Sequence, residues 1–170
     1  MHKAWPQMEA LHKAGLAKSI GVSNFNVQSV WDLMSYAQVM PAVNEVELHP
    51  YNTQKELVRF LLAQGILPIG YCPIARGANS KKTPSLFEAP TIKTLMEKYG
   101  KTGSQILLNW NLTRNCAVIP KSSSFDRQKE NFECFGFKLE EAEMAAIDEL
   151  NEYKRICDFY PHTLGFSIFA

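Results

Sequence analysis

Residues 119–127, with the sequence IPKSSSFDR, hold a dense group of side chains that could bind an anion. Lys121 offers a mobile positive charge, Ser122 begins a run of three hydroxyls, and Arg127 offers a planar guanidinium. They lie where an apolar strand is expected to end and a helix to begin, and an unpaired helix N-terminus favours anions. The pattern suits a phosphate group, although a serine-rich helix start flanked by cations is also typical of an ordinary solvated cap.

Polar or aromatic side chains also lie at the ends of the other expected strands. Ser23 and Asn24 follow the first strand, and Glu45 lies in the second. These groups could hold an amide, or they could satisfy one another inside a barrel. Tyr71 closes the third strand with a flat ring that could stack on a planar ligand, although a strand tyrosine is more often part of a core.

An alternation of strands and helices positions these residues. Apolar periodicity predicts strands over residues 18–22, 42–48, 66–71 and 117–120, and helices over 5–14, 27–36, 53–64, 91–99 and 104–114. Asn26 is placed to cap one helix, and Thr53–Glu56 and Thr102–Gln105 have the spacing of capping boxes. Because parallel strands need long crossovers, this order predicts an α/β fold with a parallel sheet. Ligands in such folds bind at the carboxyl ends of the strands.

Composition favours a single ordinary globular domain over residues 1–170. The chain is 46% hydrophobic and 21% charged, with no Gly/Ser linker and no internal repeat. Its net charge of +1 provides no field that would attract nucleic acid or an anionic membrane. No apolar run is long enough for a membrane span, and the first residues lack a secretory signal, so we expect a cytoplasmic protein.

The four cysteines are expected to be reduced packing residues. Cys72, Cys116, Cys134 and Cys157 are far apart in the sequence, and none forms a C-x-x-C pair that would indicate zinc or a redox couple. We therefore predict no metal site.

Five segments follow one another along most of the chain: GLAKSIGVSNFN (15–26), PAVNEVELHPY (41–51), GILPIGYCPI (65–74), KYGKTGSQILLNW (98–110) and VIPKSSSFDRQKEN (118–131). Together they resemble the aldo-keto reductases, which are NADP(H)-dependent oxidoreductases built on the (β/α)8 barrel. The resemblance implies NADPH as cofactor. It assigns Ser23, Asn24 and Glu45 to the nicotinamide carboxamide, Tyr71 to stacking under the ring, Lys121, Ser122 and Arg127 to the adenosine 2′-phosphate, and Glu130 and Asn131 to the adenine.

Two residues depart from the family pattern within these segments. Cys72 replaces a serine that many members carry, which is a small change. Glu45 replaces a glutamine that helps to hold the carboxamide. A carboxylate can accept a hydrogen bond from the amide nitrogen but cannot donate one to the amide oxygen, so the grip on the cofactor is expected to be altered.

The resemblance also implies that the catalytic residues are missing. The family's catalytic tyrosine, lysine, aspartate and histidine lie on its first four strands, before residue 1 of this chain. A closed barrel needs eight strands and about 200 residues or more, so the four strands predicted here form its second half. His49 is interpreted as a turn histidine packed beside its strand, and Tyr51 has no neighbour that would lower its pKa. We therefore assign no catalytic residue.

Three interpretations of function remain open. The chain carries the cofactor-binding half of an NADPH-dependent reductase of aldehydes and ketones, it is a non-catalytic NADP-binding or regulatory scaffold, or it is a truncated gene product. In the intact enzyme the partner would be a small carbonyl substrate. A half barrel leaves two strand edges open, so self-association is expected. The resemblance implies that the aromatic tail over residues 153–170 folds over the barrel mouth and shapes substrate choice; the alternative is a loose apolar end.

Overall fold

A computed structural model describes residues 2–77 and 83–157. Within them a parallel four-stranded sheet runs in the order β1 (Val22–Ser23), β2 (Val43–Glu47), β3 (Leu67–Tyr71) and β4 (Ala117–Val118). The helical elements are α1 (Trp5–Lys13), α2 (Val27–Met34), α3 (Lys55–Ala63), η2 (Leu86–Glu88), α4 (Pro90–Tyr99), α5 (Gly103–Thr113), α6 (Phe125–Phe132), η3 (Glu133–Phe135) and α7 (Glu141–Asp148). The predicted α/β fold with parallel pairing is confirmed.

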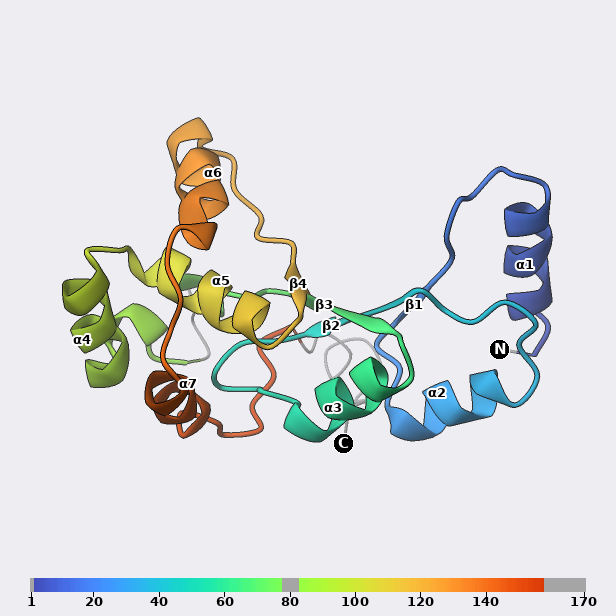
Figure 1. The fold of residues 1–170 in the computed structure, drawn as a ribbon, viewed down its shortest axis with the longest axis horizontal. Coiled ribbons are helices and arrows are strands. Elements are labelled where there is room, and N and C mark those ends of the chain that lie inside the picture. Colours follow the sequence, from blue (N-terminus) through green and yellow to red (C-terminus); the bar gives the residue numbers. More distant parts are fainter. Residues whose placement is uncertain (1, 78–82, 158–170) are drawn as a thin grey trace.

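The molecule is elongated, with the sheet at its middle (Figure 1). Helices α1 and α2 lie at the end beside β1, where Trp5 and Leu33 are buried in a small core. Helices α4 to α7 lie at the other end, where Leu107 and Trp110 of α5 belong to the core shared with α4 and α7. Strands β1 and β4 are the two edges of the sheet.

Alternation along the strands gives the sheet one face covered by helices and one that is not. Val46 and Leu48 are buried in a core with residues of α2 and α3. Since successive side chains of a strand point to opposite faces, Glu45 and Glu47 lie on the other face. That face is the one that a closed barrel turns inward, and Leu67 at the start of β3 is 41% exposed on it.

Local sequence signals account for most helix ends and for one place where the backbones before β1 and at the start of β2 lie very close together. The Asn26 side chain accepts a hydrogen bond from Ser29 N at 2.8 Å, and Thr102 and Gln105 form the predicted capping box. Gly21 is required before β1, because a Cβ there would lie 2.9 Å from the backbone oxygen of Val43.

The predicted capping box at Thr53 and Glu56 is wrong. Helix α3 is instead preceded by Gln54, which adopts a left-handed backbone with φ of 44° and makes no side-chain cap. Thr53 is buried and held by distant groups: its N–H donates to Asn151 Oδ1, and its carbonyl accepts from Arg114. These tertiary contacts replace the local cap.

The C-terminal segment returns to the sheet before residue 157. Lys154 N donates to the carbonyl of Tyr51 at 2.9 Å, and Ile156 N reaches the side chain of Glu47. The aromatic residues of the tail beyond 157 lie outside the described residues, so their predicted place over a barrel mouth is not tested. None of the described helices is both long and apolar enough to cross a membrane.

Candidate functional site

A chain of hydrogen bonds joins the carboxyl ends of β1, β2 and β3. Ser23 pairs with Glu45 in the sheet register, and its hydroxyl donates to the Glu45 carbonyl at 2.9 Å. The same carbonyl accepts the Asn24 backbone N–H at 2.9 Å. The Asn24 amide donates to Ser23 Oγ at 3.3 Å and accepts from the Tyr71 hydroxyl at 2.8 Å. The structure thus brings together the side chains of Ser23, Asn24 and Tyr71, which the sequence analysis had singled out separately, while Glu45 takes part through its backbone carbonyl.

The backbone at Asn24 makes this convergence possible. Its φ is 59°, in the left-handed region that asparagine tolerates better than most residues. The turn places the Asn24 amide next to the end of β3, 47 residues further along the chain. The exposed side-chain amide of Asn24, which has a donor group and an acceptor group, is thereby held above the carboxyl ends of the strands.

Tyr71 remains a neutral phenol in this setting. Burial, and then the nearby negative charge of Glu47, raise the pKa of Tyr71 well above its ordinary value. Glu47 is its register partner on β2, so both side chains lie on the face without helices. The hydroxyl therefore serves as a hydrogen-bond donor to Asn24, and the ring has a fixed position.

The end of β4 carries the cation and hydroxyl group predicted as an anion site. Ser124 caps α6 by accepting from Arg127 N at 3.4 Å. The Ser122 hydroxyl contacts Ser124 N at 3.2 Å and Arg127 Nε at 3.5 Å. Lys121 and Arg127 are both exposed. The guanidinium thus lies against the residue that follows Lys121, at the start of α6.

Glu130 has a structural role that the sequence analysis did not foresee. Its carboxylate accepts a hydrogen bond from the Thr102 hydroxyl at 2.8 Å, and its carbonyl accepts from the Gln105 side chain at 3.0 Å. These bonds attach the last turn of α6 to the beginning of α5. Asn131, the next residue, is half-buried. Contact of either residue with an adenine stays a prediction.

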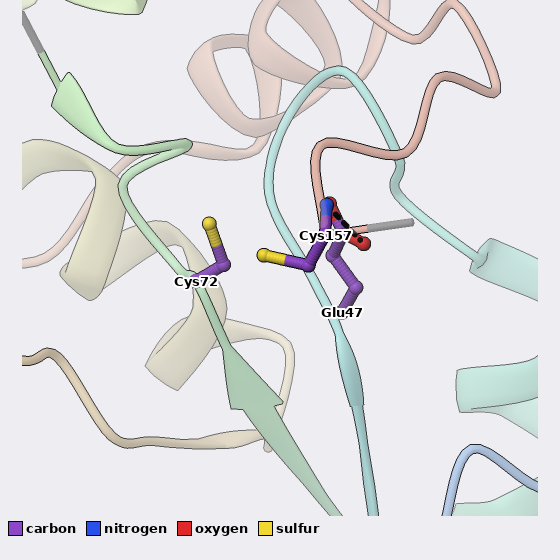
Figure 2. A group of neighbouring side chains, drawn as sticks. All are labelled: Glu47, Cys72 and Cys157. Carbon is purple, nitrogen blue, oxygen red and sulfur yellow. Dashed lines mark hydrogen bonds between the residues drawn. The ribbon is translucent and has the colours of Figure 1, made fainter. Parts of the chain in front are cut away.

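Glu47 is a buried charged residue beside the site that the sequence analysis did not single out. It is 0% exposed, and its carboxylate accepts from His49 Nε2 at 2.8 Å and Ile156 N at 2.5 Å. It also accepts from Cys157 N at 3.2 Å (Figure 2). Burial alone would raise the pKa of Glu47, but the bonds from His49, Ile156 and Cys157 outweigh it and lower that pKa. A charged residue inside an apolar strand was the available signal, but two of its partners are 109 and 110 residues away.

Comparison with known proteins decides the family. The model of the Aldo/keto reductase family matches residues 1–152. This chain is an aldo-keto reductase family member. Among curated relatives, a probable NAD(P)H-dependent D-xylose reductase of Aspergillus flavus is 44% identical over 93% of this chain and 52% of its own length. Aldo-keto reductase family 1 member A1 of Xenopus tropicalis is 44% identical over 87% of this chain and 46% of its own length.

Solved aldo-keto reductases share the fold of this family member. An aldo-keto reductase of Bombyx mori, crystallised in complex with NADP, superposes with a TM-score of 0.86 at 35% identity. The superposition covers 94% of this chain and 53% of that structure. The aldose reductase of Schistosoma japonicum gives a TM-score of 0.84 at 30% identity, with 94% and 50% covered. The chain therefore spans about half the length of the relatives it matches, consistent with four strands of a (β/α)8 barrel.

Proposed function

We propose that this chain is the NADPH-binding half of an aldo-keto reductase that reduces aldehydes or ketones to alcohols. The proposal is carried by the hydrogen-bonded group of Ser23, Asn24 and Tyr71 at the carboxyl edge of the sheet. Polar side chains at this edge are the usual ligand-binding groups of parallel α/β folds. The named relatives include NAD(P)H-dependent reductases, and one structural neighbour was crystallised with NADP.

The residues at the ends of β1 and β3 suit a nicotinamide group. The Asn24 side chain and the Ser23 hydroxyl can hold a carboxamide, since together they offer both donors and acceptors. The ring of Tyr71, fixed by its bond to Asn24, offers a flat surface on which a nicotinamide can stack. NADPH, when bound, supplies a hydride to the carbonyl carbon of the substrate. The protein's part here is to orient the ring and present one face of it.

The residues at the start of α6 suit the 2′-phosphate that distinguishes NADPH from NADH. Lys121 supplies a point charge and Arg127 a planar pair of donors, while Ser122 holds the guanidinium close to this corner. The amino end of α6 adds the positive end of its helix dipole. In this proposal Glu130 and Asn131, at the other end of α6, face the adenine.

Neither of the two described residues considered as proton donors, His49 and Tyr51, is free to donate a proton to a substrate. His49 is 0% exposed and donates its Nε2 hydrogen to Glu47. Tyr51 is 7% exposed, donates to the carbonyl of Pro84, and has a pKa raised by burial and by Glu152. Reduction of a carbonyl needs a proton donor at the oxygen. We therefore propose that the 170-residue chain binds cofactor without turning over substrate by itself.

The open sheet edges support a further part of the proposal. Strands β1 and β4 each have one unpaired side among the described residues, and the inward face of the sheet carries the exposed Leu67. We propose that the chain covers these edges by pairing with further barrel strands, or with a second copy of itself.

Fluorescence titration with NADPH and NADH tests the cofactor proposal. We expect NADPH to bind more tightly than NADH, and Lys121→Ala and Arg127→Ala each to weaken NADPH binding by roughly 10- to 100-fold, since each removes one charge-assisted contact. NADH binding should change little. Lys129→Ala is the matched control, an exposed cation on the same helix outside the proposed site, and should leave both affinities unchanged. Equal affinities of the wild-type protein for the two cofactors would refute the assignment.

An absorbance assay with NADPH and a reactive aldehyde separates the interpretations of activity. Tight binding without loss of nicotinamide absorbance supports a cofactor half or a non-catalytic scaffold. Steady turnover by the purified chain would show that one of its own residues acts as the proton donor, and it would refute the proposal that the chain has no activity by itself. Absence of NADPH binding would favour a non-functional fragment.

A further inference from the structure

Two cysteines that are distant in the sequence meet beside the predicted nicotinamide site. Cys72 directly follows Tyr71 at the end of β3, and Cys157 lies in the segment that returns to β2. Figure 2 shows the sulfur of Cys157 turned toward Cys72. The two sulfurs and a carboxylate oxygen of Glu47 lie within 4.8 Å of one another. All four cysteines are free thiols, as expected from the sequence, and these two also lie close together.

The polar groups around the pair make its two thiols unequal. A hydrogen bond from Cys72, together with the Arg76 side chain, lowers the pKa of Cys157 to about 7, against the opposing effects of burial and of Glu47. The pKa of Cys72 is raised, first by its bond to Cys157 and then by burial. The hydrogen bond thus favours the thiolate form of Cys157 and the thiol form of Cys72, which is the hydrogen-bond donor. Both residues are only partly buried, so small oxidants can reach them.

A metal ion explains this cluster less well than thiol chemistry does. The Glu47 carboxylate already accepts hydrogen bonds from His49, Ile156 and Cys157. Binding a cation through it would compete with these bonds, one of which comes from a buried histidine ring. The two sulfurs, by contrast, lie close together and are joined by a hydrogen bond.

We propose that Cys72 and Cys157 form a reversible disulfide when the protein meets a peroxide. The Cys157 thiolate attacks one oxygen of hydrogen peroxide, the O–O bond breaks, and the other oxygen leaves as water after taking up a proton. Sulfur is oxidised to a sulfenic acid and the peroxide is reduced. Cys72 then attacks that sulfur, the S–O bond breaks, and a second water leaves with the Cys72 proton. Dithiothreitol reduces the disulfide back to two thiols by exchange and is itself oxidised to a cyclic disulfide.

The disulfide would join the C-terminal segment covalently to the end of β3. In the reduced protein that segment is held by hydrogen bonds, notably those of Ile156 and Cys157 to Glu47. The disulfide would hold this segment next to Tyr71, so the oxidation state of the two cysteines would determine how firmly one side of the proposed nicotinamide site is fixed. The disulfide itself does not depend on cofactor binding, and its test needs no NADPH.

Mass spectrometry of the reduced full-length chain after hydrogen peroxide treatment tests the proposal. We expect the loss of two thiols, a Cys72–Cys157 cross-linked peptide and complete recovery with dithiothreitol. Cys116 and Cys134 are buried and have raised pKa values, about 11 for Cys116, so they serve as internal controls that remain reduced. At pH 7 iodoacetamide should label Cys157 at least ~100-fold faster than Cys116.

Two substitutions of Cys72 separate its role as hydrogen-bond donor to Cys157 from its role as disulfide partner. Cys72→Ser keeps a hydrogen-bond donor, so Cys157 should stay reactive but stop at the sulfenic acid, which dimedone traps. Cys72→Ala removes the donor and should also slow the labelling of Cys157 at pH 7. The proposal is overturned if peroxide leaves Cys157 reduced, links it between molecules, or oxidises it beyond the sulfenic acid in the wild-type protein. Protection of both thiols by zinc that EDTA removes would identify a metal site instead.

Discussion

Replacement of Glu47 by glutamine should destabilise the fold although it removes a buried charge. The carboxylate is fully buried and accepts from His49 at 2.8 Å, Ile156 N at 2.5 Å and Cys157 N at 3.2 Å. A glutamine oxygen in the place of Oε1 accepts the same bonds without the negative charge, and its NH2 group, in the place of Oε2, would face the Cys157 N–H. Weakening two charge-assisted bonds, each worth about 1.5–3 kcal/mol, gives an expected loss of about 3 kcal/mol.

The lowered pKa of Glu47 fixes the sign of this effect. The charged form is favoured in the folded protein more than in water, so the hydrogen bonds outweigh the cost of burial and a neutral analogue is worse. The charged carboxylate contributes its full stabilisation at pH values above the ordinary carboxyl pKa of about 4.3. This contribution is lost as the pH falls through the lower pKa that Glu47 has in the folded protein. Glu47→Gln should therefore lose less stability on acidification than the wild-type protein does.

Thermal and urea unfolding at pH 7 and at pH 4 measure both effects. For a protein of this size, about 3 kcal/mol corresponds to a decrease in Tm of roughly 6–12 °C. The matched control is Glu56→Gln, which removes an exposed carboxylate paired with Arg59 at 2.8 Å and should change the free energy of unfolding by less than about 0.5 kcal/mol. A Glu47→Gln protein as stable as the wild type at pH 7 would refute the reasoning.

Three further predictions concern the cofactor grip, the sheet and its edges. Glu45→Gln should tighten NADPH binding by about 2- to 10-fold, because an amide adds a donor for the carboxamide oxygen; dissociation constants that do not fall would contradict this. Gly21→Ala should lower the free energy of unfolding by about 1–3 kcal/mol in urea denaturation, because its Cβ would lie 2.9 Å from the Val43 carbonyl oxygen, whereas Gly136→Ala, with open space around it, should cost far less. Sedimentation of the isolated chain should show a dimer or larger species, and a compact, cooperatively unfolding monomer would count against the proposed role of the open edges.

Elements that depend on local signals were predictable from the sequence. The four strands and their parallel pairing follow from short apolar runs separated by amphipathic helices. The caps at Asn26 and Thr102 follow from side chains that bond to the backbone three residues further on. The Thr53 cap failed because Asn151 and Arg114, which no local pattern includes, bind its backbone. Propensity was overridden by tertiary contact.

The candidate site divides in the same way. Ser23, Asn24 and Tyr71 end predicted strands, and a parallel sheet brings such ends to one edge, so their meeting follows from topology. The bonds of Glu47 to Ile156 and Cys157 depend instead on where the C-terminal segment lies after α7, which neither periodicity nor turn chemistry determines. The same contact brings Cys157 to Cys72.

Backbone conformation at the strand ends shows why one site residue was visible and the other was not. Asn24 and Cys72 both have positive φ, 59° and 52°. Asparagine adopts this region at little cost, so its presence after a strand indicates a turn. Cysteine does not, and no local rule predicts it there.

Cys72 must be held by its surroundings, which include the turn bond from Ala75 N to the Cys72 carbonyl at 2.9 Å and the hydrogen bond to Cys157. A non-glycine residue in a strained conformation persists where the surrounding structure fixes it, and such positions gather at functional sites. The positive φ of Cys72 is therefore a second observation, beside the contact of the two thiols, that supports the proposal at the end of β3.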